Sequence, residues 1–365
     1  MPDILNPGAT KTRPTVYTRG TIYSLPCDRN GQPLRILSLL RPDAFTLLLV
    51  GTVILASLLP VTGAAVHWFT LLTNIAIGLL FFLHGAKLSR EAVMEGLTHW
   101  RLHLTVLALT YVLFPVLGLA MNWSLGALVN PMLALGLLYL CLLPSTVQSS
   151  IAFTSIAGGN VAAAVCSASA SNILGVFLTP LLVAMFMNLN GGVSWGAIIG
   201  IVCQILLPFV AGQLLRPWVG GFIARHRPLT LTVDRGSILM VVYLAFSEAV
   251  SHGLWSLLGP RDFIMLTVIC CVLLAIVLAF SIWLARWLGF SRADEIAIVF
   301  CGSKKTLASG LPMASVLFPA ASVGIIVLPL MLFHQIQLMV CAVMARRYAD
   351  SAPAETGDGA AGEGI

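Results

Sequence analysis

Ten long apolar runs between residues 44 and 345 constrain the fold of this 365-residue chain more than any other feature of its sequence. A helix needs about 20 predominantly apolar residues to cross a bilayer. We therefore expect spanning helices at 44–60, 67–86, 102–121, 132–156, 161–187, 194–215, 237–257, 263–285, 295–318 and 322–345. The chain is 58% hydrophobic and 9% charged, with a mean hydropathy of +0.96, which excludes a soluble globular domain. These features predict an all-α polytopic membrane protein.

The Lys and Arg residues are distributed unevenly among the loops of this ten-span arrangement. Seventeen lie in the N-terminal extension, after the tenth span, or in loops on the same side as both termini. The other side carries only Arg261, and two lysines fall inside a span. Because basic loops stay in the cytoplasm, we predict a membrane protein with both termini in the cytoplasm. The net charge of +6 then reflects membrane topology rather than nucleic-acid binding.

The two ends of the chain differ in composition from the apolar part. Residues 1–43 are basic, lack the apolar segment of a signal peptide, and are expected to form a disordered or surface-bound cytoplasmic extension. Residues 349–365 are rich in Ala, Gly and acidic residues and are expected to be disordered. The eight cysteines are scattered without the paired spacing of a metal site, so we interpret them as reduced core residues.

The ten spans divide into two groups of five, over 44–187 and 194–345. An odd number of spans in each group gives the groups opposite orientations, which is the arrangement of an inverted repeat. Polar residues interrupt the fourth span at 143–150 and the ninth at 301–306, at corresponding places in the two groups. We predict that helices 4 and 9 are broken and cross, so that their freed backbone groups can bind an ion or an anion.

The ninth span contains Lys304 and Lys305 between apolar runs. A lysine near the bilayer centre costs roughly 3 kcal/mol, so it normally faces a cavity or a partner. Gly302, Gly310 and Pro312 weaken the helix around the pair, which indicates a broken helix at a substrate site. Alternatively, the lysines mark a cytoplasmic loop before a single span from 307 to about 330. The preceding segment would then be too short to span, and the agreement with the basic loops would be lost.

Several short motifs follow one another in the order found in a known family. They occur at 83–88 (LHGAKL), 158–160 (GGN), 162–164 (AAA), 178–182 (LTPLL), 212–216 (GQLLR), 300–301 (FC), 305–307 (KTL), 310–313 (GLPM) and 333–334 (FH). Over residues 40–347 the chain resembles the bile acid/sodium symporter superfamily. Its local sequence is more similar still to the orphan branch that bacteria share with solute carrier family 10 member 7 of animals. This resemblance implies a place in a bacterial inner (plasma) membrane.

The resemblance implies a panel domain of spans 1, 2, 6 and 7 and a core domain of spans 3–5 and 8–10 that moves against it. It also implies transport of organic anions together with two sodium ions bound where helices 4 and 9 cross. Such relatives have a carboxylate just before the ninth-span break, and Gln and Asn within it. This chain has Phe300 in place of the acid and the lysine pair near the amides, which calls sodium coupling into question.

The polar residues around the two breaks are candidates for binding a substrate or an ion. They are Lys305, Lys304, Ser303, Thr306, Thr146, Gln148, Ser149, Ser150, Asn160, Asn172, His334 and Gln335. The hydroxyl groups of Ser149, Ser150 and Thr306 could supply ligands to sodium. Lys305 could instead take the place of a cation, bind an anionic substrate directly, or lose its charge on burial and permit proton coupling.

Each candidate also has a purely structural interpretation. Lys304 could snorkel to the membrane interface, and the polar residues of the fourth span could hydrogen-bond between helices. Asn160 could cap the following helix, and Asn172 could belong to a stripe of small and polar residues for close packing. His334 and Gln335 could form hydrogen bonds in the core.

We predict a secondary transporter that moves a small organic anion by alternating access, with no cofactor other than Na⁺ or H⁺ as a coupling ion. A non-transporting regulator of ion homeostasis is an alternative. A Ser–Lys hydrolase is another, because Lys305 and Ser309 are spaced to share a helix face. The hydrolase interpretation leaves the even distribution of spans and the repeat unexplained, so we do not expect an enzyme. No phosphate-binding loop, HExxH or GxSxG motif occurs, so we do not expect ATP-driven transport by this chain alone. Lipid is the expected partner, and the sequence pattern does not indicate an oligomeric state.

Overall fold

The computed structural model describes residues 15–18, 21–24, 44–87, 99–125, 129–187 and 202–351. The chain divides into two units, residues 1–42 and 43–365. In the first unit, strands β1 (Thr15–Thr18) and β2 (Thr21–Ser24) form an antiparallel hairpin in which Val16 pairs with Tyr23. The β-branched and aromatic residues of both strands favour an extended backbone, a local signal that the all-α prediction did not include. The rest of the N-terminal extension and residues 352–365 lie outside the described residues.

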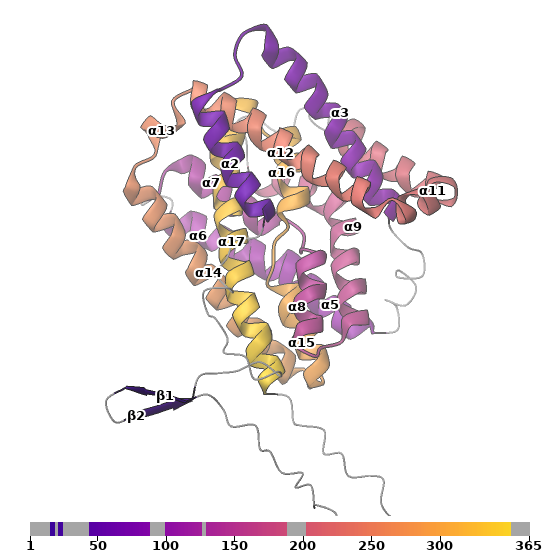
Figure 1. Ribbon diagram of the computed structural model, residues 1–365, viewed down its shortest axis with the longest axis vertical. Coiled ribbons are helices and arrows are strands. Elements are labelled where there is room, and N and C mark those ends of the chain that lie inside the picture. The colour runs from indigo at the N-terminus through magenta and orange to yellow at the C-terminus, as the bar shows by residue number, and fades with distance from the viewer. Residues whose placement is uncertain are drawn as a thin grey trace, which may run out of the picture. The chain divides into compact units, whose positions relative to one another are not determined.

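Helices make up most of the described part of the second unit (Figure 1). The first half contains α2 (Ala44–Leu58), α3 (Ala64–Lys87), α5 (Trp100–Ala108), the π-helix η1 (Leu109–Leu113), α6 (Phe114–Leu125), α7 (Pro131–Leu142), α8 (Gln148–Ile156) and α9 (Val161–Phe186). The second half contains the π-helix η2 (Val202–Leu206), α11 (Leu207–Arg225), α12 (Arg227–Ser251), α13 (Leu254–Leu257), α14 (Pro260–Trp287), α15 (Arg292–Gly302), α16 (Leu307–Leu317) and α17 (Ala320–Asp350). The prediction of a helical fold is confirmed for this unit.

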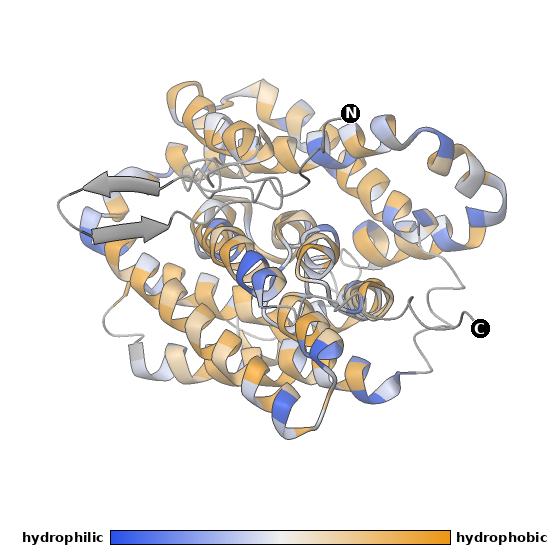
Figure 2. Ribbon diagram, turned by 60° about the horizontal axis from the view of Figure 1, so that its bottom comes forward, coloured by the Kyte–Doolittle hydropathy of each residue, from blue (hydrophilic) through white to orange (hydrophobic). Residues whose placement is uncertain are grey.

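Within the described ranges, seven helices are long and apolar enough to cross a membrane. Helices α2 and α7 are apolar but shorter. The expected fourth span is divided into α7 and α8 and the expected ninth into α15 and α16, and none of these four helices is long enough for a full crossing. Figure 2 shows hydrophobic residues along most of the helices, and large side chains such as Leu58 and Trp123 are exposed, as a hydrocarbon solvent permits. The chain is therefore an integral membrane protein, while the ten-span inverted repeat stays a prediction.

Two groups of helices pack within the second unit. We call α2, α3, α11 and α12 the panel helices, because α3 packs along α11 and α12 packs against α2 and α3. We call α5 to α9, with η1, and α14 to α17 the core helices, since α7 packs against α6 and α17, and α15 packs against α5, α8, α9 and α14. The two groups meet where α12 contacts α16 and α17.

Two glycines bring α3 and α11 into backbone contact. A Cβ atom on Gly85 would lie 2.1 Å from the carbonyl oxygen of Phe209, and one on Gly212 would lie 2.0 Å from that of Phe82. Any larger residue at either position would have to move a backbone. Two of the family motifs, at 83–88 and 212–216, contain these glycines, so helix packing explains part of each motif.

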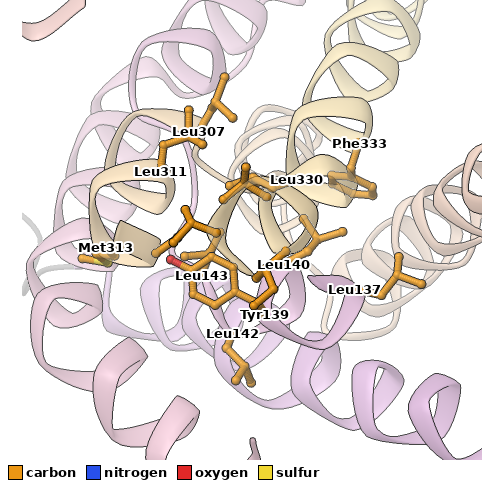
Figure 3. Packing of buried hydrophobic residues seen from close by; sticks show 14 of the residues in the cluster. Leu137, Tyr139, Leu140, Leu142, Leu143, Leu307, Leu311, Met313, Leu330 and Phe333 are labelled. Carbon is orange, nitrogen blue, oxygen red and sulfur yellow. The ribbon is translucent and has the colours of Figure 1, made fainter. Parts of the chain in front are cut away.

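The core helices enclose a large apolar cluster around the ends of α7 and α16 (Figure 3). Tyr139 lies among Leu143, Leu311 and Leu330, and its hydroxyl group donates a hydrogen bond of 2.6 Å to the carbonyl oxygen of Gly310. This bond joins the helix before the first break to the helix after the second. Apolar packing and a buried hydrogen bond therefore hold the two breaks at a fixed distance.

Candidate functional site

The two breaks in the helices contact each other. Thr306, just before α16, donates its backbone N–H to the carbonyl oxygen of Pro144 at 3.0 Å. The Ser145 hydroxyl donates to the carbonyl oxygen of Cys301, and the Ser150 hydroxyl donates to that of Phe300 at 2.8 Å. The breaks predicted from the sequence are thus present and meet. The alternative of a loop before one span over 307–330 is wrong, because α16 ends at Leu317 and both lysines are buried.

Pro144 explains the first break. Proline has no N–H for the helical ladder and pushes the residue before it into an extended conformation. Leu143 has φ −80° and ψ 157°, so α7 ends at Leu142 and an extended residue leads into the proline. Backbone carbonyl groups at the end of α7 consequently lose their helical donors.

Lys305 supplies donors to these carbonyl groups. Its side chain is fully buried, and its Nζ atom donates to the carbonyl oxygens of Thr110 at 2.9 Å, Cys141 at 3.0 Å and Leu143 at 2.6 Å. The Phe114 ring lies under the same atom, 4.0 Å away at its centroid. An ammonium group has three donors and no acceptor, so three carbonyl oxygens satisfy it completely.

Two of these carbonyl groups, those of Thr110 and Cys141, are free for a local reason. In η1 the Phe114 N–H bonds to the carbonyl oxygen of Leu109, and the next residue, Pro115, has no N–H, so the carbonyl of Thr110 lacks a helical donor. The Ser145 N–H, four residues after Cys141, donates instead to the Ser171 hydroxyl at 3.1 Å. A π-helix and a proline break thus create an acceptor set for one cation.

Gln337 on α17 fixes the backbone of Lys305 and was missed from the sequence. Its side-chain oxygen accepts from the Lys305 N–H at 2.9 Å, and its side-chain nitrogen donates to the Lys305 carbonyl oxygen at 2.9 Å. His334 also lies 3.3 Å from that carbonyl oxygen. Gln337 lies three residues after His334 and therefore on the same helix face, and this spacing was the signal that the sequence offered for Gln337. Gln335, which was predicted for the site, instead accepts a hydrogen bond from the Thr46 hydroxyl at 3.0 Å.

Lys304 points to a different environment. Its Nζ atom lies 4.1 Å from the centroid of the Phe153 ring and 5.2 Å from that of Phe300, and it has no hydrogen-bond partner among the described residues. The side chain is fully buried, so it does not snorkel to an interface. The two adjacent lysines therefore differ in surroundings: Lys305 has three hydrogen-bond acceptors, whereas Lys304 lies against two aromatic rings.

A cavity of about 420 Å³ lies between the breaks and the panel helices. Half of the predicted site residues line it, namely Thr146, Gln148, Ser149, Asn172, Thr306 and His334. The panel helices contribute Phe81, His84, Lys87, Phe209, Leu231, Asp234, Arg235 and Ile238. A second cavity of about 800 Å³ shares Lys87, Gln148, Leu231 and Asp234 with the first, so the two adjoin.

The charged residues that line these cavities are mainly basic. Lys87 forms an ion pair with Asp234, Arg235 lies over the Phe45 ring at 5.4 Å from its centroid, and Arg216 lines the larger cavity. Three basic groups and one acidic group give a positive potential, which attracts anions. None of these four charged residues was among the predicted site residues. The predicted spans place Arg216 and Arg235 in a cytoplasmic loop.

The remaining predicted residues lie outside the cavity lining. The Ser303 hydroxyl donates to the Val299 carbonyl oxygen at 2.6 Å within its own helix. Asn160 caps α9 by accepting from the Ala163 N–H at 3.0 Å, and it donates to the Asp294 carboxylate at 2.9 Å. The capping interpretation of Asn160 thus has direct geometric support.

Two of the three hydroxyl groups proposed as sodium ligands donate hydrogen bonds within the protein. Ser149 donates to the Thr146 hydroxyl at 2.9 Å, while Ser150 donates to the carbonyl oxygen of Phe300. The described part of the chain has no group of three His, Cys, Asp or Glu residues that could hold a metal. Lys305 takes three backbone carbonyl groups at the junction, so its nitrogen occupies the place that these oxygens would offer to another cation.

Lys305 and Ser309 do not form the pair that a Ser–Lys hydrolase needs. The Lys305 ammonium is bonded to three backbone carbonyl groups, and the Ser309 hydroxyl is buried with no hydrogen-bond partner in the part of the chain described. A nucleophilic serine has to lie within hydrogen-bond reach of its base. The geometry offers no such contact.

An apolar helical body with two broken helices in contact, a buried cation and an adjoining cavity is the architecture of a membrane transporter. Residues 43–350 match the sequence model of the SBF-like CPA transporter family, and the chain belongs to that family. The resemblance stated from the motifs is thereby confirmed, as is the prediction that the chain is a transporter and not an enzyme.

Related proteins extend over most of the chain. An uncharacterized protein of Pseudomonas aeruginosa is 60% identical over 310 residues, which cover 84% of this chain and 93% of that protein. The protein named "Putative symporter YfeH" of Escherichia coli is 58% identical over 307 residues, or 84% of this chain and 92% of its own length. "Sodium/bile acid cotransporter 7" of Danio rerio is 27% identical over 320 residues, covering 85% and 94%.

Proposed function

We propose that this protein is a secondary active transporter that moves a small organic anion across a bacterial inner membrane by alternating access. Its ten spans would form the 5+5 inverted repeat over 44–187 and 194–345, with both termini in the cytoplasm. The single observation that carries the proposal is the Lys305 ammonium, held by three carbonyl oxygens where the two broken helices meet. Broken helices that meet beside a cavity are where secondary transporters bind their substrates.

The lining of the cavities supports an anionic substrate. Lys87, Arg216 and Arg235 outnumber Asp234, and the Gln148 side chain lies on the border of both cavities. Apolar side chains of the panel helices would contact the organic part of the solute. Electrostatic attraction would bring an anion to this region, and hydrogen bonds from the break residues would orient it.

The role that we assign to Lys305 is that of a built-in cation. The relative from Danio rerio is named for sodium and bile acid, and in this chain an ammonium group would supply a positive charge without a bound ion. Because its three donors are all used, Lys305 would act on the anion through its charge and by fixing the shape of the breaks. Transport would then not require sodium.

The packing of the helices supports movement of the core against the panel. Gly85 and Gly212 lock α3 to α11, so the panel helices would move as one body. The cavity lies between this body and the breaks, and α12 contacts α16 and α17 along the boundary. Sliding at this boundary would expose the cavity to one side of the membrane and then to the other.

The test begins with thermal unfolding of the purified protein in sodium, potassium or choline chloride at equal ionic strength. A panel of small carboxylates, sulfonates and phosphate esters is then screened, since a ligand at about 100 times its Kd adds about 2.7 kcal/mol of stability. The anion that stabilises the protein is used for uptake into liposomes. We expect uptake in all three salts, its loss in Lys305→Ala that remains folded, and normal uptake by Arg261→Ala. Equal uptake by Lys305→Ala, or stabilisation by sodium alone, would contradict the proposal.

A further inference from the structure

Lys304 has a feature that the role of Lys305 does not explain. Its side chain is fully buried, yet its Nζ atom lacks a hydrogen-bond partner among the described residues. The atom lies instead over the rings of Phe153 on α8 and Phe300 on α15, which are themselves neighbours. Buried polar groups in proteins nearly always have a partner, so this exception needs a cause.

The ionisable groups around Lys304 supply no compensating negative charge. Its nearest titratable neighbours are the thiols of Cys301 on α15 and Cys341 on α17, and α8 presents an aromatic ring. The closest carboxylate along α15, Glu295, already accepts hydrogen bonds from two arginines and a tyrosine. The adjacent Lys305 ammonium is a like charge, held by η1 and the end of α7.

An ammonium ion without acceptors is far more costly to bury than a neutral amine. The two aromatic faces return only part of that cost. We propose that Lys304 is a neutral amine in this conformation and binds a proton when the core helices move against the panel, which makes it the proton site of the transport cycle. Lys305 keeps its charge throughout, whereas Lys304 gains and loses one.

This inference rests on the proposed function in one respect, the stage of the transport cycle at which the proton binds. Thr306, two residues after Lys304, and Ser149, one turn before Phe153, both line the smaller cavity. An anion in that cavity favours the ammonium form of a nearby lysine, so the proton binds together with the anion. The step adds one proton from solution to the Nζ lone pair, and the return step releases it on the other side of the membrane. No other bond forms or breaks.

The chain has only four lysines, Lys11, Lys87, Lys304 and Lys305, so nitrogen NMR can observe each side chain separately. Protein with nitrogen-15 in the lysine side chains is placed in lipid nanodiscs, and arginine replaces Lys11 and Lys87 to leave two signals. At neutral pH we expect one amine signal and one ammonium signal with slowly exchanging protons. Lys304→Met should remove the amine signal, and Lys305→Met should remove the ammonium signal. Two ammonium signals at neutral and alkaline pH would overturn the proposal.

Proton movement is tested in liposomes that contain a pH-sensitive dye. Uptake of the anion found by the stability screen should acidify the lumen for the wild-type protein and for the control Arg261→Ala, and Lys304→Met should abolish the acidification. If Lys304→Met does not fold, Lys304→Arg, which holds its charge permanently, should have the same effect. Unchanged acidification in a folded Lys304 variant overturns the proposal. A wild-type protein that moves no anion counts against the proposed function alone, because the NMR signals are read without transport.

Discussion

The ammonium nitrogen of Lys305 lies 2.6 Å from the carbonyl oxygen of Leu143, so a side chain from the second broken helix closes the end of the first. The same nitrogen bonds to Thr110 in η1, which adds a third segment to the junction. A buried cation at this point therefore has a structural role in addition to the electrostatic one proposed for transport.

Replacement of this ammonium should be partly reversible by a small amine. Lys305→Ala leaves three buried carbonyl oxygens without donors, and we expect a loss of about 3 kcal/mol in the free energy of unfolding. Methylammonium fits the vacated space and has three donors, so it should raise the unfolding temperature of the variant and not of the wild-type protein. Tetramethylammonium, which has no N–H, is the control. Equal effects of the two ions would show that the carbonyl groups do not hold the charge.

The contact between α3 and α11 should not tolerate a side chain in place of Gly85 or Gly212. Gly85→Ala or Gly212→Ala would place a methyl group within about 2 Å of a backbone oxygen, and overpacking of this kind typically costs about 1–3 kcal/mol. Gly51→Ala, on α2, is the matched control, because a Cβ atom there meets nothing within 4 Å. In that open helical position alanine should be neutral or stabilising by up to about 1 kcal/mol. Unfolding temperatures in one detergent or nanodisc decide the comparison, and equal values for all three variants would contradict it.

The ion pair of Lys87 and Asp234 should affect ligand binding more than stability. The side chains are 34% and 16% exposed, and partly exposed ion pairs contribute at most about 1 kcal/mol to folding. Asp234→Asn removes the negative charge from the cavity lining and should strengthen binding of the identified anion several-fold. Lys87→Met should weaken binding by a similar factor. Ligand-induced shifts in unfolding temperature measure both, and changes in the same direction would refute the electrostatic argument.

Gln337 should be more important for stability than Gln335. Gln337→Met removes the partner of both backbone groups of Lys305, and loss of two buried hydrogen bonds should cost about 2–3 kcal/mol. Gln335→Met removes one half-buried bond to Thr46 and should cost under about 1 kcal/mol. Unfolding temperatures of the two variants, measured side by side, provide the check. A larger loss for Gln335→Met would mean that the junction does not depend on Gln337.

Polar residues in mid-span made both breaks predictable, and Gly302 added a local signal for the second. The part that Pro144 plays in the first break is evident from the structure. The contacts of Lys305 were not predictable from side-chain patterns, since all three acceptors are backbone carbonyl groups, and that of Thr110 is free only because of η1 and Pro115. Asp234 was missed for another reason: α12 begins at residue 227, within the segment that the charge pattern had assigned to a loop. Charge distribution therefore indicates the side of a membrane and not where each helix ends.

The covalent attachment of the Lys305 ammonium has an electrical consequence for the proposed cycle. A dissolved cation would cross the membrane once per cycle, whereas an ammonium fixed to the chain returns with its helices and adds nothing to the net charge moved. With one proton on Lys304 for each monovalent anion, transport is electroneutral, and a voltage worth about 2.3 kcal/mol per charge at 100 mV does not drive it. The pH difference across the membrane alone then sets how far the anion accumulates, and transport continues in a depolarised cell.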